Sequence, residues 1–266
     1  MIYPLFRYNL KSNRLLWISM ISVMSMYYLI ILSMFDPKSV EALNAMLEMF
    51  PKALLDAMGF TQFGTTLIEY IVGYIYGFLI FLFPMVFVVS LHHKLMASPI
   101  DKGSFIHIMS THHSRIKILL TQLISSWVLV LGFFSATTLI SSLGAILMFP
   151  NELDLGGYLF INVYVIVLYL AISAILFMIS SIVEEGSHAL TLQVSVPVFF
   201  VLMKMLAGVG EKFEWLKYFT LLSLFDPNKV LNQNASMWGM MAILILIATV
   251  CYGFTFIQFN KRNLYL

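Results

Sequence analysis

Residues 66–91 read TLIEYIVGYIYGFLIFLFPMVFVVSL, a run in which Glu69 is the only charged side chain. An α-helix needs about 20 mostly apolar residues to cross the roughly 30 Å hydrocarbon core of a bilayer. Runs of this kind recur at 15–35, 118–149, 158–183, 189–209 and 237–259. We therefore expect an all-α membrane protein with six transmembrane helices. Pro84 and Pro197 lie inside the second and fifth runs, where each frees a helix carbonyl that a neighbouring group must satisfy.

The composition assigns most of the chain to lipid. Of the 266 residues, 61% are hydrophobic and 11% are charged, whereas about 25% of residues are charged in a soluble domain. We expect one multi-pass transmembrane domain over 1–266. The net charge of +2 argues against nucleic acid as a partner. No phosphate-binding glycine motif is present, so the sequence predicts a chain without its own nucleotide site and not an enzyme.

The basic residues predict the orientation. Lys and Arg concentrate in cytoplasmic loops, and an inside N-terminus gives the cytosolic face the larger share: Arg7, Lys11, Arg14, Lys94, Lys102, Arg115, Lys117, Lys261 and Arg262. The outer face then carries Lys38, Lys52, Lys212, Lys217 and Lys229. With an even number of spans, both termini are expected in the cytosol.

Four segments outside the spans have their own patterns. Residues 1–14 combine apolar and basic side chains, as in a helix lying on the inner leaflet. Residues 37–64 predict a pair of short amphipathic helices on the outer face, and 208–236 predict short helices or re-entrant turns there. The fourth segment, 92–117, is the long polar interruption of the chain.

The 92–117 segment predicts a short cytosolic helix. Ser98, Pro99 and Asp101 have the spacing of a helix start, and Gly103 weakens it, so a start at Ser104 is the alternative. Beyond it, Phe105 and Met109 share one face. The segment is either a surface helix joining two spans or a docking helix for a cytosolic partner.

Several stretches resemble type-2 ABC exporter permeases, in particular the peptide or toxin exporters. Residues 101–122, DKGSFIHIMSTHHSRIKILLTQ, resemble the stretch before that family's third span. Residues 50–60, FPKALLDAMGF, and 219–229, FTLLSLFDPNK, are similar to its outer segments. Residues 259–264, FNKRNL, resemble its ending, with Asn263 where an aspartate is usual, and His112 and His113 stand where many members have a proline.

The resemblance implies a permease that pairs with a second copy or a paralogue, above two cytosolic ABC ATPase subunits. ATP and Mg would be bound by those partners, so no cofactor is expected in this chain. The resemblance makes 92–117 the coupling loop, with the ATPase contact formed by Lys102, Phe105, His107, Met109, His112 and Arg115. The expected activity is export of an amphipathic or hydrophobic substrate, with antimicrobial or toxin-like peptides first and lipid-linked or drug-like molecules next.

Two pairs of charges are further candidates. Glu69 and Lys204 lie near the outer ends of the second and fifth spans. Charges inside spans are functional candidates by default; these two either reach the interface separately or pair at the mouth of a pathway. Glu184 and Glu185 form a solvated cytosolic turn or a second ATPase contact.

The remaining motifs favour packing over chemistry. Gly73 and Gly77 predict close helix packing in the second span. The adjacent histidines in 92–117 invite a metal interpretation, but neighbours on a helix do not share a face, so no metal site is expected. Two rival functions are an intramembrane enzyme, for which the spans lack a converging polar set, and a structural or sensory subunit that binds partners without transport.

Overall fold

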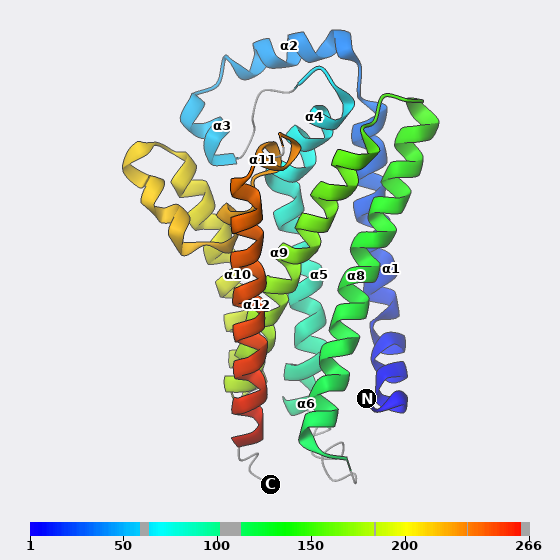
Figure 1. Ribbon diagram of the computed structural model, residues 1–266, viewed down its shortest axis with the longest axis vertical. Helices are drawn as coiled ribbons and strands as arrows, with labels where there is room; N and C mark the ends of the chain where they lie inside the picture. The colour runs from blue at the N-terminus through cyan, green and yellow to red at the C-terminus, as the bar shows by residue number, and fades with distance from the viewer. Residues whose placement is uncertain (59–63, 102–112, 184, 233, 262–266) are drawn as a thin grey trace.

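The computed structural model describes residues 1–58, 64–101, 113–183, 185–232 and 234–261; the side chains of 38, 39, 41, 58, 100, 101, 260 and 261 are outside the description. Its described part is helical, with no strand. Figure 1 shows long helices running side by side along one axis, with the short helices α2, α3 and α11 gathered at the end opposite the termini. Phe105, Met109 and the other loop candidates from 102 to 112 lie outside the described residues.

Six stretches are long and apolar enough to cross a membrane, as the hydropathy pattern predicted. They are α1 (Tyr3–Ser33), the continuous stretch Leu67–Ala97, α8 (Arg115–Met148), α9 (Leu155–Ile182), α10 (Gly186–Gly208) and α12 (Ser236–Lys261). The second stretch consists of α4 (Leu67–Ile71), the π-helix η1 (Val72–Leu79), α5 (Ile80–His92) and the π-helix η2 (His93–Ala97). At 1.5 Å per residue, α8 is about 50 Å long and extends beyond a bilayer core.

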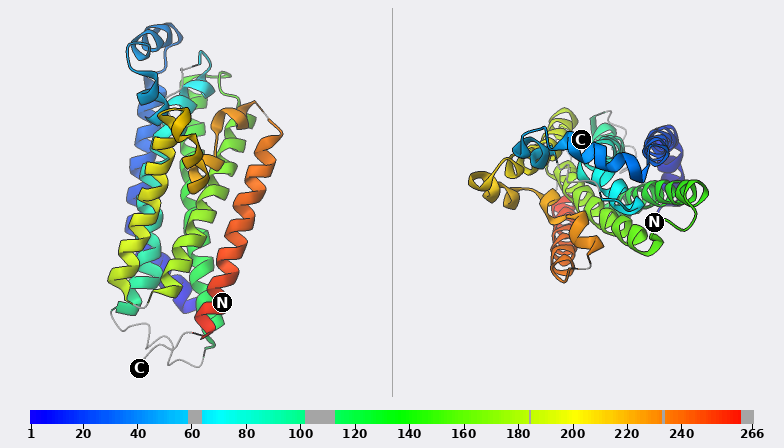
Figure 2. Two further views of the ribbon diagram at one scale, coloured as in Figure 1. Left: turned by 90° about the vertical axis from the view of Figure 1, so that its left-hand side faces the viewer. Right: turned by 90° about the horizontal axis from the view of Figure 1, so that it is seen from above.

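The short elements form two groups. Helices α2 (Pro37–Leu47) and α3 (Lys52–Met58) occupy the expected outer segment between the first two spans. The 3₁₀ helices η3 (Glu211–Phe219) and η4 (Leu221–Leu224) and the helix α11 (Pro227–Leu231) follow α10. Seen from above in Figure 2, η3 projects sideways from the bundle.

Local sequence explains where several of these helices begin. Thr66 caps α4, and its hydroxyl accepts from the Glu69 amide while the Glu69 carboxylate accepts from the Thr66 amide, a capping box. Asp154 caps α9 by accepting from the Gly156 and Gly157 amides at 3.1 and 3.2 Å. Both devices satisfy amides that a helix start leaves unpaired.

One predicted helix start is wrong. Ser98 has helical dihedral angles and directly follows η2, so α6 (Ser98–Asp101) continues the second span and Ser98 does not cap a new helix. Residues 3–14, within the segment expected at the inner leaflet, form the first turns of α1.

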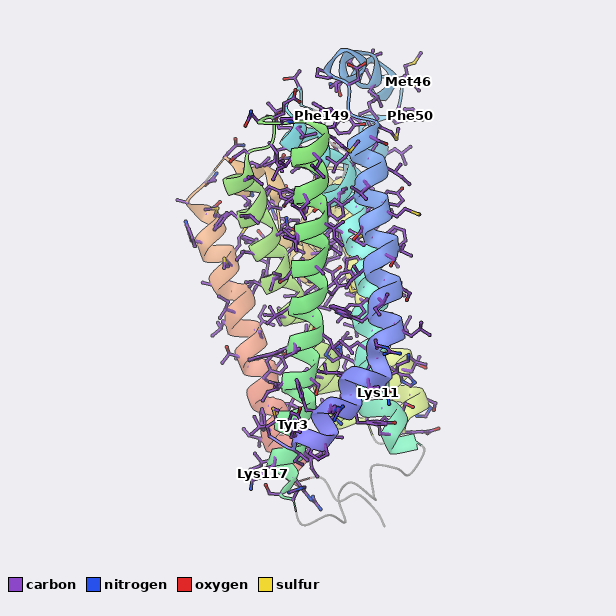
Figure 3. All side chains as sticks on the ribbon, turned by 90° about the vertical axis from the view of Figure 1, so that its right-hand side faces the viewer. Tyr3, Lys11, Met46, Phe50, Lys117 and Phe149 are labelled. Atoms are coloured by element: carbon purple, nitrogen blue, oxygen red, sulfur yellow. The ribbon has the colours of Figure 1, made fainter. Side chains whose placement is uncertain are left out.

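The first turns of α1 pack on α8 through polar groups. Figure 3 shows the helix slanting across the foot of α8 between Tyr3 and Lys11 before it turns upright. Asn9 is buried there, and its amide donates to the Gln122 side-chain oxygen at 2.7 Å and to the Ser125 hydroxyl at 3.0 Å. Higher up, Trp17 fills the space left by Gly132 on α8 and donates to the Leu129 carbonyl.

The centre of the bundle is formed by the second span and α9. In each of these two spans, 61% of the residues in the apolar 18-residue stretch are buried inside the bundle. The corresponding share is 17% in α10 and in α12, which therefore lie at the periphery. Tyr169 of α9 is buried at this centre, and its hydroxyl donates to the Ile80 carbonyl at 2.5 Å. That carbonyl is the one that Pro84 leaves without its usual helix partner. The sequence-based expectation that a neighbouring group satisfies it is confirmed.

Candidate functional site

An apolar groove runs lengthwise between the second span and α10. It encloses about 580 Å³ and is hereafter the α5–α10 groove. Its lining residues are Phe81, Leu82, Met85, Val86, Val89, Ser90, His93, Lys94, Leu190, Val194, Pro197, Val198, Val201 and Leu202. From Phe81 to Lys94 the wall is roughly 20 Å long at 1.5 Å per residue, more than half the thickness of a hydrocarbon core.

The groove is open along its side. Val86 on one wall is 55% exposed and Val198 on the other is 50% exposed. Pro197 beside Val198 is buried. The groove is therefore accessible from the side of the bundle between these two valines.

A second, more polar cavity continues the groove at the end opposite the termini. It encloses about 290 Å³, and Phe81 and Val201 line both spaces. Lys204, Asp56, Glu214, Lys217 and Asp226 bring charge into it, and we call it the Lys204 cavity. The two spaces together extend from the Lys204 cavity down to Lys94.

The Lys204 ammonium makes its direct contacts with neutral groups. It donates to the Leu222 carbonyl at 3.2 Å and lies 3.8 Å from the centre of the Phe81 ring. Asp226 attracts it electrostatically. The Asp226 carboxylate, however, accepts from the Asn228 amide at the start of α11 and lies 3.6 Å from the Lys229 ammonium.

The structure does not bring Glu69 and Lys204 together. Glu69 is exposed and used in the capping box of α4. Lys204 points instead to Leu222 and Phe81. The hypothesis that these two charges pair is therefore wrong, because a helix start competes for the carboxylate; Lys204 alone stays in the candidate site.

The other acid–base pair of the cavity lies on η3. The Lys217 ammonium donates to the Glu214 carboxylate at 2.6 Å. This hydrogen bond holds the pKa of Glu214 below its usual value and raises the pKa of Lys217. Glu214 and Lys217 thus compensate each other's charge. Among the described lysines that line the cavity, Lys204 is the one without a carboxylate within 4 Å.

The structure describes only some of the residues predicted to contact the ATPase. Lys102, Phe105, His107, Met109 and His112 lie outside the described residues. Arg115 begins α8 at the end of the bundle where the chain starts, and its side chain is half-buried. Glu185 begins α10 at this same end, and Glu184 is outside the description. The Glu185 carboxylate lies 3.1 Å from His188 and accepts from the Ser187 hydroxyl, an exposed local cluster.

The histidines divide between core and surface. His92 is fully buried; Nδ1 lies 2.8 Å from the Val88 carbonyl and Nε2 lies 3.0 Å from the Ser126 hydroxyl. With Nδ1 protonated, the ring donates to Val88 and accepts from Ser126, so it joins α5 to α8. His113 is exposed. Within the described ranges, no three His, Cys, Asp or Glu side chains are placed to hold a metal ion.

The glycine pair of the second span falls within η1. Gly73 is buried, and Gly77 lines the Lys204 cavity. Nearby, the Tyr28 hydroxyl donates to that of Tyr76 at 3.3 Å, which joins α1 to η1. A π-helix is rare and frequently occurs at functional sites, and this one forms part of the cavity wall.

Sequence reasoning missed the groove itself. The useful signal was the pair of prolines in the second and fifth spans, because Pro197 lines the groove and Pro84 lies between the lining residues Leu82 and Met85. Their positions did not reveal that the two spans face each other. A comparison with protein-family models finds no match to this chain, and a search of curated proteins finds none either.

Proposed function

We propose that this chain is the permease subunit of an ATP-driven exporter of the type-2 ABC class. The observation that carries the proposal is the α5–α10 groove, an open apolar passage along the bundle that ends near a lysine at each end. The sequence resemblance supplies the class. The proposed substrate is amphipathic or hydrophobic, because the described lining of the groove holds only three polar side chains, Ser90, His93 and Lys94.

We propose a bacterial cell membrane with both termini in the cytosol. Figure 3 shows Lys11 and Lys117 at the end of the bundle where Tyr3 lies, with Met46, Phe50 and Phe149 at the other. Exposed Arg7, Lys11 and Arg14 on α1 and exposed Lys94 add basic charge to the first end. The excess of Lys and Arg in cytoplasmic segments supports this orientation.

The proposed work is mechanical. Two partner ATPases bind and hydrolyse ATP with Mg, and this chain contributes no group to that chemistry. The coupling loop, 92–117, includes η2 at one end and the first residues of α8 at the other, so a displacement of the loop acts on both spans. The hydrogen bond of His92 to Ser126 ties the same two spans together. Because α5 forms one wall of the groove, moving it changes the width of the passage.

The pathway in this proposal lies between two permease subunits, a copy or a paralogue. The exposed valines and leucines of α5 and α10 leave the groove open on one side. A second subunit facing this side would convert two open grooves into one enclosed passage. The rival function, a structural or sensory subunit, uses the same loop to bind a partner and moves no solute.

Copurification tests the proposal. The chain would be expressed with any ABC ATPase whose gene adjoins its own, and complex formation and ATP hydrolysis would be measured in lipid. Replacing Phe105 and Met109 together by Asp should abolish the complex, since two charges would enter the apolar face that the sequence predicts for the docking helix. Lys212→Glu on η3, at the opposite end of the bundle, is the matched control and should leave it intact. If no ATPase binds the unmodified chain, the exporter proposal is refuted.

A further inference from the structure

The groove and the charges at its two ends point to one class of ligand. We propose that the α5–α10 groove binds an anionic amphiphile, with its acidic head at Lys204 and its alkyl chain along the groove. The inference rests on the proposed transport function and narrows its substrate class. The head is a carboxylate or a phosphate, the two groups for which a lysine ammonium is a suitable partner.

The walls of the groove suit an alkyl chain. The side chains between its ends are aliphatic or aromatic apart from Ser90, and its described lining contains no acid. An alkyl chain lying in the groove would bury apolar surface that is now exposed on residues such as Val86 and Val198. The wall of roughly 20 Å matches a chain that reaches from one interface past the middle of a bilayer.

The Lys204 ammonium has capacity for an anion. An ammonium carries three N–H donors, and the structure gives this one a single hydrogen bond, to the Leu222 carbonyl. Among the other charges of the cavity, Asp226 attracts Lys204 without a hydrogen bond to it, and the rest are paired with each other or lie at the edge. Glu214 is paired with Lys217, Asp226 caps α11 and faces Lys229, and Asp56 is exposed on α3.

The opposite end of the groove carries charge of the same sign. Lys94 is exposed there, next to His93. An acidic head therefore finds a lysine at each end, although the carboxylates of Asp56, Glu214 and Asp226 also line the Lys204 cavity. Within the substrate classes consistent with the proposed exporter, the two lysines and the absence of an acid from the described lining of the groove favour an acidic, lipid-like molecule over a basic peptide. Lys94 would receive the head at the cytosolic side and Lys204 would hold it after crossing.

Photolabelling of the purified full chain tests this site. Three probes with the same diazirine-bearing alkyl chain would be used in vesicles of zwitterionic lipid: a fatty acid, an alkyl phosphate and the fatty alcohol. Labelled peptides would be mapped by mass spectrometry. We expect labels on 82–89 and 194–202, with at least one acidic probe labelling about tenfold more than the alcohol, which is ~1.4 kcal/mol in affinity. The stronger acidic probe identifies the head group.

Variants separate the head site from the groove. Lys204→Met should remove the preference for acidic probes, and Lys204→Arg should keep it. Val198→Trp should fill the groove and reduce labelling by all three probes. Lys212→Met, at an exposed lysine outside both cavities, is the matched control. If Lys204→Met does not elute as folded protein, Lys204→Arg and Val198→Trp still test the proposal. The first should keep the preference for acidic probes, and the second should lower labelling by all three probes.

Equal labelling by acid, phosphate and alcohol would overturn the proposal, as would an acidic preference that survives Lys204→Met. Labels confined to other surfaces of the bundle would overturn it as well. The assay contains no ATPase, so its failure leaves the proposed exporter role standing. Conversely, a chain that binds no ATPase could still label as expected, and the two results remain distinct.

Discussion

Replacing Tyr169 by Phe tests how the bundle accommodates a proline at its centre. Tyr169 is fully buried, and its hydroxyl donates to the Ile80 carbonyl at 2.5 Å. Pro84 has no N–H, so this carbonyl lacks the helix partner that residue 84 would otherwise supply. Tyr169→Phe removes one hydroxyl and leaves the ring and its packing against Phe134 in place.

The expected cost follows from what the carbonyl loses. Leaving a buried acceptor without its partner costs about 1–3 kcal/mol. Hydrogen bonds between membrane helices average about 0.6 kcal/mol because alternative partners are found, with a maximum near 1.7. Since Pro84 removes the nearest alternative partner, we expect about 1.5 kcal/mol for Tyr169→Phe, near the upper end of the membrane range.

The same change in a Pro84→Ala background should cost about 0.5 kcal/mol or less, because an alanine at 84 returns a backbone N–H to the carbonyl. Reversible unfolding of the full chain in mixed micelles, as a double-mutant cycle, measures the coupling, expected at about 1 kcal/mol. Tyr164→Phe is the matched control; its hydroxyl donates to the Leu224 carbonyl at 2.9 Å, far from Pro84 in sequence. A cost of Tyr169→Phe that is equal in both backgrounds would refute the reasoning.

Three further predictions concern other contacts. A Cβ at Gly208 would lie 2.5 Å from the backbone oxygen of Asp56; Gly208→Ala should therefore separate α3 from α10 and speed hydrogen exchange in α3, and unchanged exchange would count against this contact. Asn9→Leu removes the donor from two buried oxygens on α8, those of Gln122 and Ser125, and should cost about 1–2 kcal/mol in unfolding experiments; a neutral result would contradict the role of this cluster. The stability added by the exposed Glu214–Lys217 pair is small and is lost as pH falls through the lowered pKa of Glu214 and as pH rises through the raised pKa of Lys217; Glu214→Gln should therefore lower stability slightly near neutral pH and not in acid, and an equal loss at both pH values would be the contrary outcome.

The sequence alone determined the class of the fold and the place of its spans. Hydropathy over a span reports only the solvent around a helix, and lipid imposes a length of about 20 apolar residues. The six predicted runs therefore agree with the six helices that could cross a membrane. The ends were less well determined, since α1 begins at Tyr3 and the second span continues through Ser98 into α6. Polar residues can extend a helix past the bilayer, and hydropathy does not detect them.

The tertiary structure decided which spans face each other and what their polar groups do. Lipid-facing and protein-facing surfaces of a membrane helix are both apolar, so no periodic signal distinguishes them. For this reason the α5–α10 groove was not visible in the sequence, although Pro84 and Pro197 marked both of its walls. The sequence positions of Glu69 and Lys204 allowed an ion pair between their spans. In the structure, however, Glu69 forms the capping box of α4 and Lys204 donates to the Leu222 carbonyl. Which group a charged side chain binds depends on distances in three dimensions, and these distances cannot be read from the order of residues in the sequence.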